Sequence, residues 1–212
     1  MKRYVAETLG TFTLVFCGTG AIVINQQAQG AVTHLGIAVT FGLVVMALIF
    51  AFGKLSGAHI NPAVSLAFAL TPIFPKKDLI PYIIAQIIGA LLASGILKLL
   101  FPTVATLGET LPAGSEMQSF VLEIILTYFL MLVILMVSQN TPDVGQYTAI
   151  AVGAVVLLEA LFAGPITGAS MNPARSIGPA IVAGNFKSLW VYIAAPIIGA
   201  VLATFSWQYF KD

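Results

Sequence analysis

The stretches "SGAHINPAVSLAFAL" (residues 56–70) and "TGASMNPARSIGPAI" (residues 167–181) decide the fold of this chain. Each has Asn-Pro-Ala behind small residues and ahead of an apolar segment. Because Asn caps helices well and Pro suits the first helical position, each motif predicts the start of a helix. A helix of about ten residues is about 15 Å long, half the hydrocarbon core of a bilayer. The two predicted helices, 61–70 and 172–182, therefore span a membrane only as a pair that meets near its midplane.

The composition indicates that most of the surface faces lipid. Hydrophobic residues make up 59% of the 212 positions and charged residues only 8%, against about 25% in soluble domains. A net charge of +1 gives no electrostatic basis for binding nucleic acid. Further apolar stretches are long enough to cross a bilayer, at 4–26, 34–53, 79–101, 118–139, 147–164 and 188–209.

The two halves of the chain repeat. "YVAETLGTFTLVF" (4–16) resembles "FVLEIILTYFLML" (120–132), and Glu7 matches Glu123. Each half holds three full spans and one half-span, and an odd number of crossings inverts the second half relative to the first. Transport proteins use this layout with the site at the repeat interface. We predict one domain of inverted repeats joined by an outer loop: residues 1–212, with repeats at about 1–103 and 117–212.

The positive charges predict an orientation in the membrane. Cytoplasmic loops carry an excess of Lys and Arg. With six crossings, one side of the membrane collects most of these residues: Lys2, Arg3, Lys54, Lys76, Lys77 and Lys211. We therefore expect a multi-pass protein of the plasma or inner membrane with both termini in the cytoplasm.

The half-helices predict a path for small neutral molecules. Each helix N-terminus carries roughly +0.5 charge, and two such ends at one point repel cations. The Asn side chains can donate hydrogen bonds to an oxygen of a passing molecule, and the loop carbonyls before each motif can accept hydrogen bonds from its hydroxyl groups. The residues that we expect at this point are Asn61, Pro62, Ala63, Asn172, Pro173 and Ala174.

The motifs "SGAHINPAVS" and "NPARSIGPA" resemble those of aquaporins, in the major intrinsic protein family, and the resemblance covers essentially the whole chain. It implies an all-α membrane protein, a right-handed bundle of six transmembrane helices plus two re-entrant half-helices with an inverted repeat. It also implies a homotetramer in the lipid bilayer, with one pore per subunit and passive flow without a cofactor. The resemblance places the selectivity filter at Phe41, Ala160, Ala169 and Arg175, and the pore-lining loops at Gly57, Ala58, His59, Gly168 and Ser170.

The filter positions predict which solutes pass. Ala160 and Ala169 are small, and strict water channels of the family have histidine at the position of Ala160. "LFAGPITGASMNPARSIGPAI" and "LPAGSEMQSFVLEIILT" resemble the nodulin-type subfamily, whose members pass water, glycerol, urea and undissociated boric, silicic or arsenous acid. We therefore predict a channel for water and small neutral solutes. The alternatives are a strict water channel and, with less support, a proton-coupled transporter.

Three carboxylates lie inside predicted spans. Glu7 and Glu123 can accept hydrogen bonds from backbone N–H groups of the neighbouring re-entrant loops, which predicts that they support the loops. A proton relay is the alternative. Glu159, beside Ala160, can accept hydrogen bonds from the outer loop or act on the filter through Arg175; we favour a role behind the filter, and the sequence leaves the choice open. The sequence has no metal-ligand cluster and no nucleophile beside a base, so we expect neither a metal site nor an enzyme.

Overall fold

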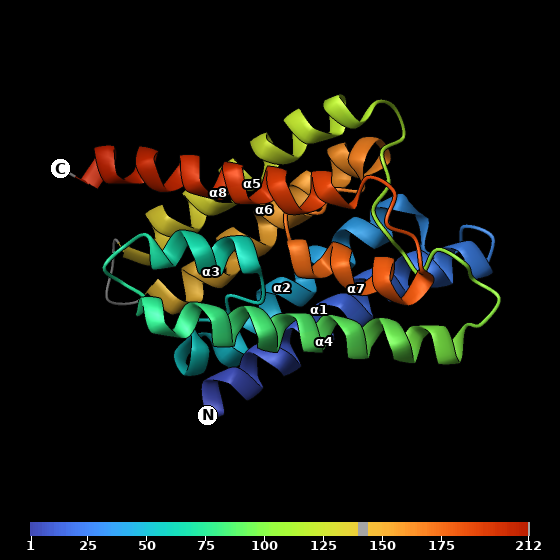
Figure 1. The fold of residues 1–212 in the computed structure, drawn as a ribbon, viewed down its shortest axis with the longest axis horizontal. Helices are drawn as coiled ribbons and strands as arrows, with labels where there is room; N and C mark the ends of the chain where they lie inside the picture. Colours follow the sequence, from blue (N-terminus) through green and yellow to red (C-terminus); the bar gives the residue numbers. More distant parts are fainter. Residues whose placement is uncertain (140–143, 212) are drawn as a thin grey trace.

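The computed structural model describes residues 1–139 and 144–211, and this part of the chain is helical with no strand (Figure 1). The side chains of residues 139, 144–146 and 211 lie outside the description, and so does the predicted cytoplasmic charge of Lys211. The helices are α1 (Lys2–Gln27), α2 (Thr33–Ser56), α3 (Pro62–Ala69), α4 (Leu79–Leu100), α5 (Glu116–Gln139), α6 (Val144–Thr167), α7 (Pro173–Ala183) and α8 (Leu189–Lys211), with a 3₁₀ turn, η1, at Lys76–Asp78.

Six of these helices are long and apolar enough to cross a membrane, and α3 and α7 have about half their length. This confirms the predicted fold class and places every predicted span within a few residues. The end of α6 differs from the prediction, which stopped it before Pro165. The helix continues past Pro165 to Thr167, and the carbonyl that loses its helical donor to Pro165, that of Leu161, receives a hydrogen bond from His34.

The helices pack in two similar sets. Helix α1 packs on α4 and α5 packs on α8, while α2 packs on α6 between the sets. Gly89 and Gly199 mark the closest approaches: a Cβ at Gly89 would lie 2.3 Å from the Thr8 carbonyl oxygen, and one at Gly199 would lie 2.3 Å from that of Ile124. Figure 1 shows α3 and α7 in opposite halves of the long axis, so the half-helices enter the bundle from opposite ends.

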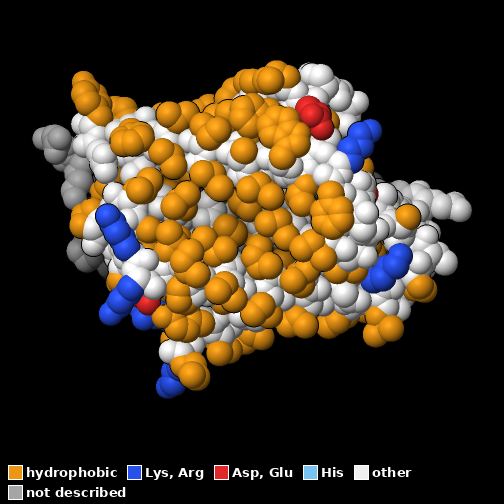
Figure 2. All heavy atoms as spheres, in the orientation of Figure 1, with side chains coloured by type: hydrophobic (Ala, Val, Ile, Leu, Met, Phe, Trp, Pro, Cys, Tyr) orange, Lys and Arg blue, Asp and Glu red, His pale blue; other side chains and the backbone are white. Residues whose placement is uncertain are grey.

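The exterior matches a lipid environment. Figure 2 shows a broad hydrophobic band around the middle of the visible face, with the Lys, Arg, Asp and Glu side chains confined to the two ends of the long axis. Large apolar side chains such as Leu43, Ile84 and Phe205 are exposed on the long helices. The protein is therefore a multi-pass integral membrane protein, and the start of α1 and the end of α8 lie at the same end of the bundle (Figure 1).

Candidate functional site

The two loops before the half-helices share an unusual backbone. Gly57, Ala58 and Ile60 have positive φ angles of 85°, 46° and 43°. The second loop repeats this pattern at residues 168, 169 and 171, with φ angles of 83°, 43° and 54°. Left-handed conformations cost non-glycine residues roughly 1–2 kcal/mol each, so the surrounding structure must hold both loops in place.

Glu7 holds the first loop from α1. Its side chain is fully buried, and its carboxylate accepts hydrogen bonds from the backbone N–H groups of His59 at 3.0 Å and Ile60 at 2.7 Å. The Ser56 hydroxyl and the Gln86 amide donate two more, at 2.7 and 2.8 Å. These bonds satisfy backbone donors that the left-handed loop cannot pair within itself.

Glu123 holds the second loop from α5. It is also fully buried, and it accepts hydrogen bonds from the backbone N–H groups of Ser170 and Met171, both at 2.8 Å. The Thr167 hydroxyl donates a further bond. Both glutamates thus contact the loop that precedes the half-helix of their own half of the chain.

Tyrosines on α4 and α8 anchor the start of each loop. The Tyr82 hydroxyl donates to the Ser56 carbonyl at 2.7 Å, and the Tyr192 hydroxyl donates to the Thr167 carbonyl at 2.8 Å.

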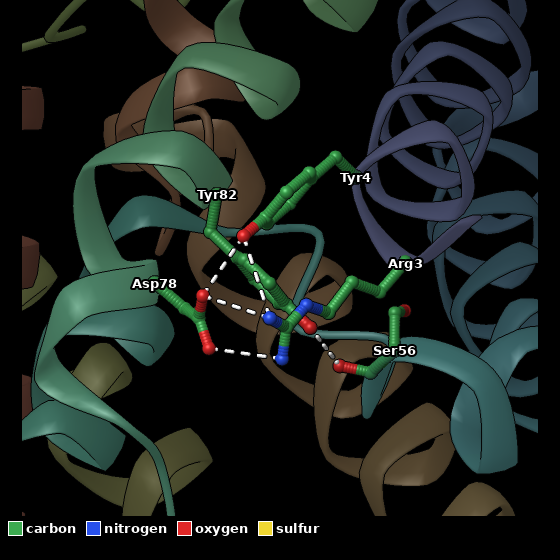
Figure 3. Close-up of polar contacts among 5 residues, drawn as sticks. All are labelled: Arg3, Tyr4, Ser56, Asp78 and Tyr82. Atoms are coloured by element: carbon green, nitrogen blue, oxygen red, sulfur yellow. Dashed lines mark hydrogen bonds and ion pairs between the residues drawn. The ribbon is translucent and has the colours of Figure 1, made fainter. Parts of the chain in front are cut away.

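A second set of contacts lies beside Tyr82, where Asp78 at the start of α4 accepts from residues of α1 (Figure 3). The donors are the Tyr4 hydroxyl at 2.8 Å and the Arg3 guanidinium, whose two terminal nitrogens each lie 2.9 Å from one carboxylate oxygen. These contacts tie the first turn of α1 to α4, next to the tyrosine that anchors the first loop.

The two Asn residues begin the half-helices and cross-link them. The Asn61 side-chain oxygen accepts from the first turn of α3, and that of Asn172 accepts from the first turn of α7. Each amide nitrogen donates to the opposite loop: Asn61 to the Met171 carbonyl at 2.7 Å and Asn172 to the Ile60 carbonyl at 2.9 Å. An amide has two N–H groups. One is engaged across the interface between the loops, which leaves one for a solute.

A cavity of about 110 Å³ runs past this junction. One water molecule needs at least ~10–15 Å³, so the cavity has room for several waters. The cavity is lined by both asparagines and by all four residues predicted for the filter. Gly57, Ala58, His59 and Ser170 of the two loops line it as well. Gly168 packs against Thr110 outside the lining, and the Pro and Ala residues of both motifs are buried in the first turns of α3 and α7.

Further lining residues carried no signal in the sequence because apolar positions inside a span look alike whether they face a pore, a neighbouring helix or lipid. On the helices these residues are Leu14, Val45, Ile49, Val64, Phe68, Leu130, Ile134, Val152 and Val156, and in the loops directly before the two asparagines Ile60 and Met171 line the cavity as well. Ser138 and Thr148 also line the cavity, and a hydroxyl in a span is a weak signal for such a position.

Arg175 brings a positive charge to the lining, and its side chain is only 2% exposed. One of its terminal nitrogens donates to the Gly108 carbonyl at 2.8 Å, and its guanidinium carbon lies 5.2 Å from the centre of the Phe41 ring. Gly18 makes room for that ring, since a Cβ there would lie 2.2 Å from it. The loop between α4 and α5 and helix α2 therefore fix the guanidinium, and the Nε–H has no partner among the described residues.

Ala160 and Ala169 both line the cavity, where their methyl groups occupy little of the cross-section. Glu159 is 1% exposed but is not among the described residues of the lining. Neither of its carboxylate oxygens has a hydrogen-bond partner in the part of the chain that the structure describes. A direct contact of Glu159 with Arg175, which the sequence left open, is therefore not made here.

Comparisons with known proteins agree with this geometry. The family model described as Major intrinsic protein matches residues 1–207. Aquaporin NIP1-1 of Zea mays is 48% identical over 210 residues, covering 99% of this chain and 74% of the relative. Nodulin-26 of Glycine max is 43% identical over 210 residues, covering 99% and 77%. The X-ray structure of the aquaglyceroporin from Plasmodium falciparum matches with a TM-score of 0.87 and 28% identity, covering 100% of this chain and 95% of that one.

The family model matches nearly the whole chain, and the identity to these relatives is high. Together they assign the chain to one family. The bundle is aquaporin-like, and the relatives are channels, not enzymes. The chain belongs to the major intrinsic protein family of membrane channels.

Proposed function

We propose that the protein is a passive channel for water and small neutral solutes: glycerol, urea and undissociated metalloid acids such as boric, silicic or arsenous acid. The observation that carries the proposal is the cavity that passes both Asn side chains and is bordered by Arg175 and two alanines, Ala160 and Ala169. The amides of both asparagines and the Arg175 guanidinium offer hydrogen bonds to a hydroxyl or carbonyl oxygen of the solute. The alanines leave space beside them for a solute larger than water.

The same elements exclude ions. The N-termini of α3 and α7 meet at the cross-linked Asn residues, and each end carries roughly +0.5 charge. Arg175 adds a full positive charge on the lining. A cation that enters the cavity is repelled by these positive charges. No carboxylate of the described lining compensates them, because Glu7 and Glu123 lie outside that lining and are hydrogen-bonded to the loops.

The names of the relatives favour this range of solutes. Two relatives are a NIP-type aquaporin and Nodulin-26, and the matching solved structure is an aquaglyceroporin. As parts of the same proposal, residues 1–212 form one channel domain of two inverted repeats, and four copies assemble in the plasma or inner membrane with their termini in the cytoplasm. The matched bonds of Glu7 and Glu123 support the repeats.

The bonding of Glu7 and Glu123 disfavours a proton-coupled transporter. A relay needs a carboxylate that meets the transport path and exchanges its proton there. Both carboxylates instead accept backbone N–H bonds at 2.7–3.0 Å and lie outside the cavity lining of the described residues. We assign them to loop support.

Stopped-flow light scattering on liposomes containing the protein tests the proposal. Sucrose gradients measure water flow, and gradients of glycerol, urea or boric acid measure solute flow through the rate of reswelling. Fast shrinkage followed by fast reswelling, both absent from protein-free liposomes, is the expected result. Fast shrinkage without reswelling would indicate a strict water channel. Saturable uphill uptake driven by a pH gradient would indicate a coupled transporter.

A further inference from the structure

His34 makes a contact between the two long helices that carry filter residues. It lies in the first turn of α2, seven residues before Phe41, and its ring Nε2 is 2.6 Å from the carbonyl oxygen of Leu161 on α6. Leu161 directly follows Ala160, which borders the cavity. Because a carbonyl only accepts, Nε2 must carry the proton.

The Leu161 carbonyl is open to this donor because of Pro165. In an α-helix the carbonyl of residue 161 pairs with the N–H of residue 165, and proline has no N–H. Gly164 makes room for the donor, since a Cβ there would lie 2.9 Å from Cε1 of the His34 ring. Pro165 thus leaves the Leu161 carbonyl without a donor in α6, Gly164 leaves space beside it, and the His34 ring of α2 fills that space and donates to the carbonyl.

A second close contact fixes the same two helices on the inner side of the filter. A Cβ at Gly42 would lie 2.7 Å from the Gly153 carbonyl oxygen, and one at Gly153 would lie 2.8 Å from that of Gly42. Phe41 is next to this glycine contact, and Ala160 is next to the His34 contact. The helices run antiparallel, so the two contacts bracket the filter on α2 and α6.

We propose that His34 is a positioning residue for selectivity: its hydrogen bond to Leu161 sets the separation of Phe41 and Ala160, and with it the size of solute that the pore admits. The inference rests on the proposed function for its solute readout. Both neutral imidazole protonated at Nε2 and imidazolium donate from this nitrogen, so the bond holds in either state. Without this bond the end of α6 near Leu161 is no longer held to α2, and a water molecule can donate to the Leu161 carbonyl in place of His34.

The test compares the ratio of glycerol to water permeability in a small set of variants. His34→Ala should change this ratio by about threefold, within the net worth of one hydrogen bond. His34→Gln, whose amide can donate to the same carbonyl, should stay near the wild-type ratio. Leu35→Ala is the matched control, because Leu35 is in the same turn and 57% exposed. It should leave the ratio unchanged.

A double-mutant cycle with Pro165 separates positioning from general damage. Pro165→Ala restores the N–H that can pair with the Leu161 carbonyl inside α6. His34→Ala should then have no further effect on the ratio in the Pro165→Ala background. An equal effect in both backgrounds, or no effect of His34→Ala in the wild type, would overturn the proposal.

A spectroscopic measurement tests the contact between His34 and Leu161 even if the channel carries only water. The ¹⁵N chemical shifts of labelled histidine in the intact protein report which ring nitrogen holds the proton. We expect His34 to be protonated at Nε2, and Pro165→Ala to weaken that preference. The Nδ1 tautomer in the wild type would refute the contact. Absence of glycerol flow in the wild type with Nε2 protonated would instead refute only the proposed solute range.

Discussion

The two halves of the channel share one scaffold. In each half a glutamate binds the backbone of the left-handed loop, a tyrosine binds a carbonyl at the start of that loop, and an asparagine begins the half-helix. The corresponding residues are Glu7 and Glu123, Tyr82 and Tyr192, and Asn61 and Asn172. The backbone geometry therefore comes from interactions that are present twice.

The chemistry of the lining differs between the halves, and two pairs of positions beside the motifs show this. Three residues after the motif's asparagine stands Val64 in the first half and Arg175 in the second, and both border the cavity. Two residues before it stand His59 and Ser170. The two halves thus share a backbone scaffold but place different side chains on the cavity, and Arg175 of the second half adds a positive charge there.

His59 and Ser170 also differ in their surroundings. The His59 ring stacks on Phe68 with centroids 4.7 Å apart and lies 5.1 Å from the Tyr82 ring, so aromatic side chains surround it. The Ser170 hydroxyl lies 2.6 Å from that of Ser176, in a set of small polar groups. His59 thus lies among aromatic rings, whereas Ser170 lies beside another small polar group.

Breaking the shared scaffold should have the largest effect. Gly89→Ala and Gly199→Ala should each prevent folding, because the new Cβ would lie 2.3 Å from a backbone oxygen that cannot move without its helix. The yield of detergent-extracted, monodisperse protein measures this. Gly95→Ala on α4 is the control, since no atom of the described residues lies within 4 Å of its Cβ position. It should be neutral or stabilising by up to about 1 kcal/mol. Good expression of only one of the two colliding variants would contradict the equivalence of the halves.

Glu7→Gln and Glu123→Gln should have smaller effects. An amide keeps one acceptor oxygen, so one loop N–H loses its partner in each variant, at a cost of about 1–3 kcal/mol. The Gln86 amide oxygen has no partner among the described residues, so it can turn to accept from the new amide in Glu7→Gln, and this variant should lose slightly less. Thermal unfolding in detergent and water permeability per folded protein measure the two losses side by side. A pH-driven flux that disappears in either variant would instead support a proton relay.

Changing the filter should affect solutes more than stability. In Ala160→His an imidazole would fill cavity space that a methyl group leaves open, so we expect glycerol permeability to fall at least tenfold, or about 1.4 kcal/mol in barrier height. Water permeability should fall much less, because water needs a narrower path. Stopped-flow measurements on the same liposomes give both values. Equal reduction of water and glycerol flow would mean that residue 160 does not set the size limit.

The fold was predictable because its strongest signals are local. Long apolar runs and the Asn-Pro start of each half-helix depend on neighbouring residues alone, and they predicted the helices to within a few residues. The contact of His34 with the Leu161 carbonyl was missed, because these residues are 127 positions apart in the chain. The cross-links from the two Asn side chains to the opposite loops were also missed, since they form only when the two half-helices meet.

The site was partly predictable for the same reason. Residues with a motif around them, such as Arg175 and both Asn, were found by their spacing and by the family resemblance. The carbonyl of Gly108, which binds Arg175 from a loop, has no side chain to mark it. Glu159 was noticed as a charge in a span, but its lack of a partner among the described residues depends on how the helices pack around it.

The stability of the protein should show a small pH dependence through Glu109, in the loop between α4 and α5. Partial burial raises the pKa of the Glu109 carboxyl, and a hydrogen bond from Asn185 offsets part of that rise. The folded protein therefore holds this proton to higher pH than the unfolded chain does. The stabilising contribution is complete below the unfolded pKa of about 4.3 and is lost as pH rises through the folded value.

Glu109→Gln isolates this contribution from the other carboxylates that titrate in the same range. Between about pH 4 and about pH 7, the Tm of the wild type should fall relative to that of the variant, because only the wild type acquires a partly buried charge. Glu109 is partly exposed, so the shift should be small, and paired thermal scans in one detergent are needed to resolve it. Parallel pH profiles would show that Glu109 is solvated alike in the folded and unfolded chain. A wild type that gains stability relative to the variant would mean that the bond from Asn185 outweighs burial.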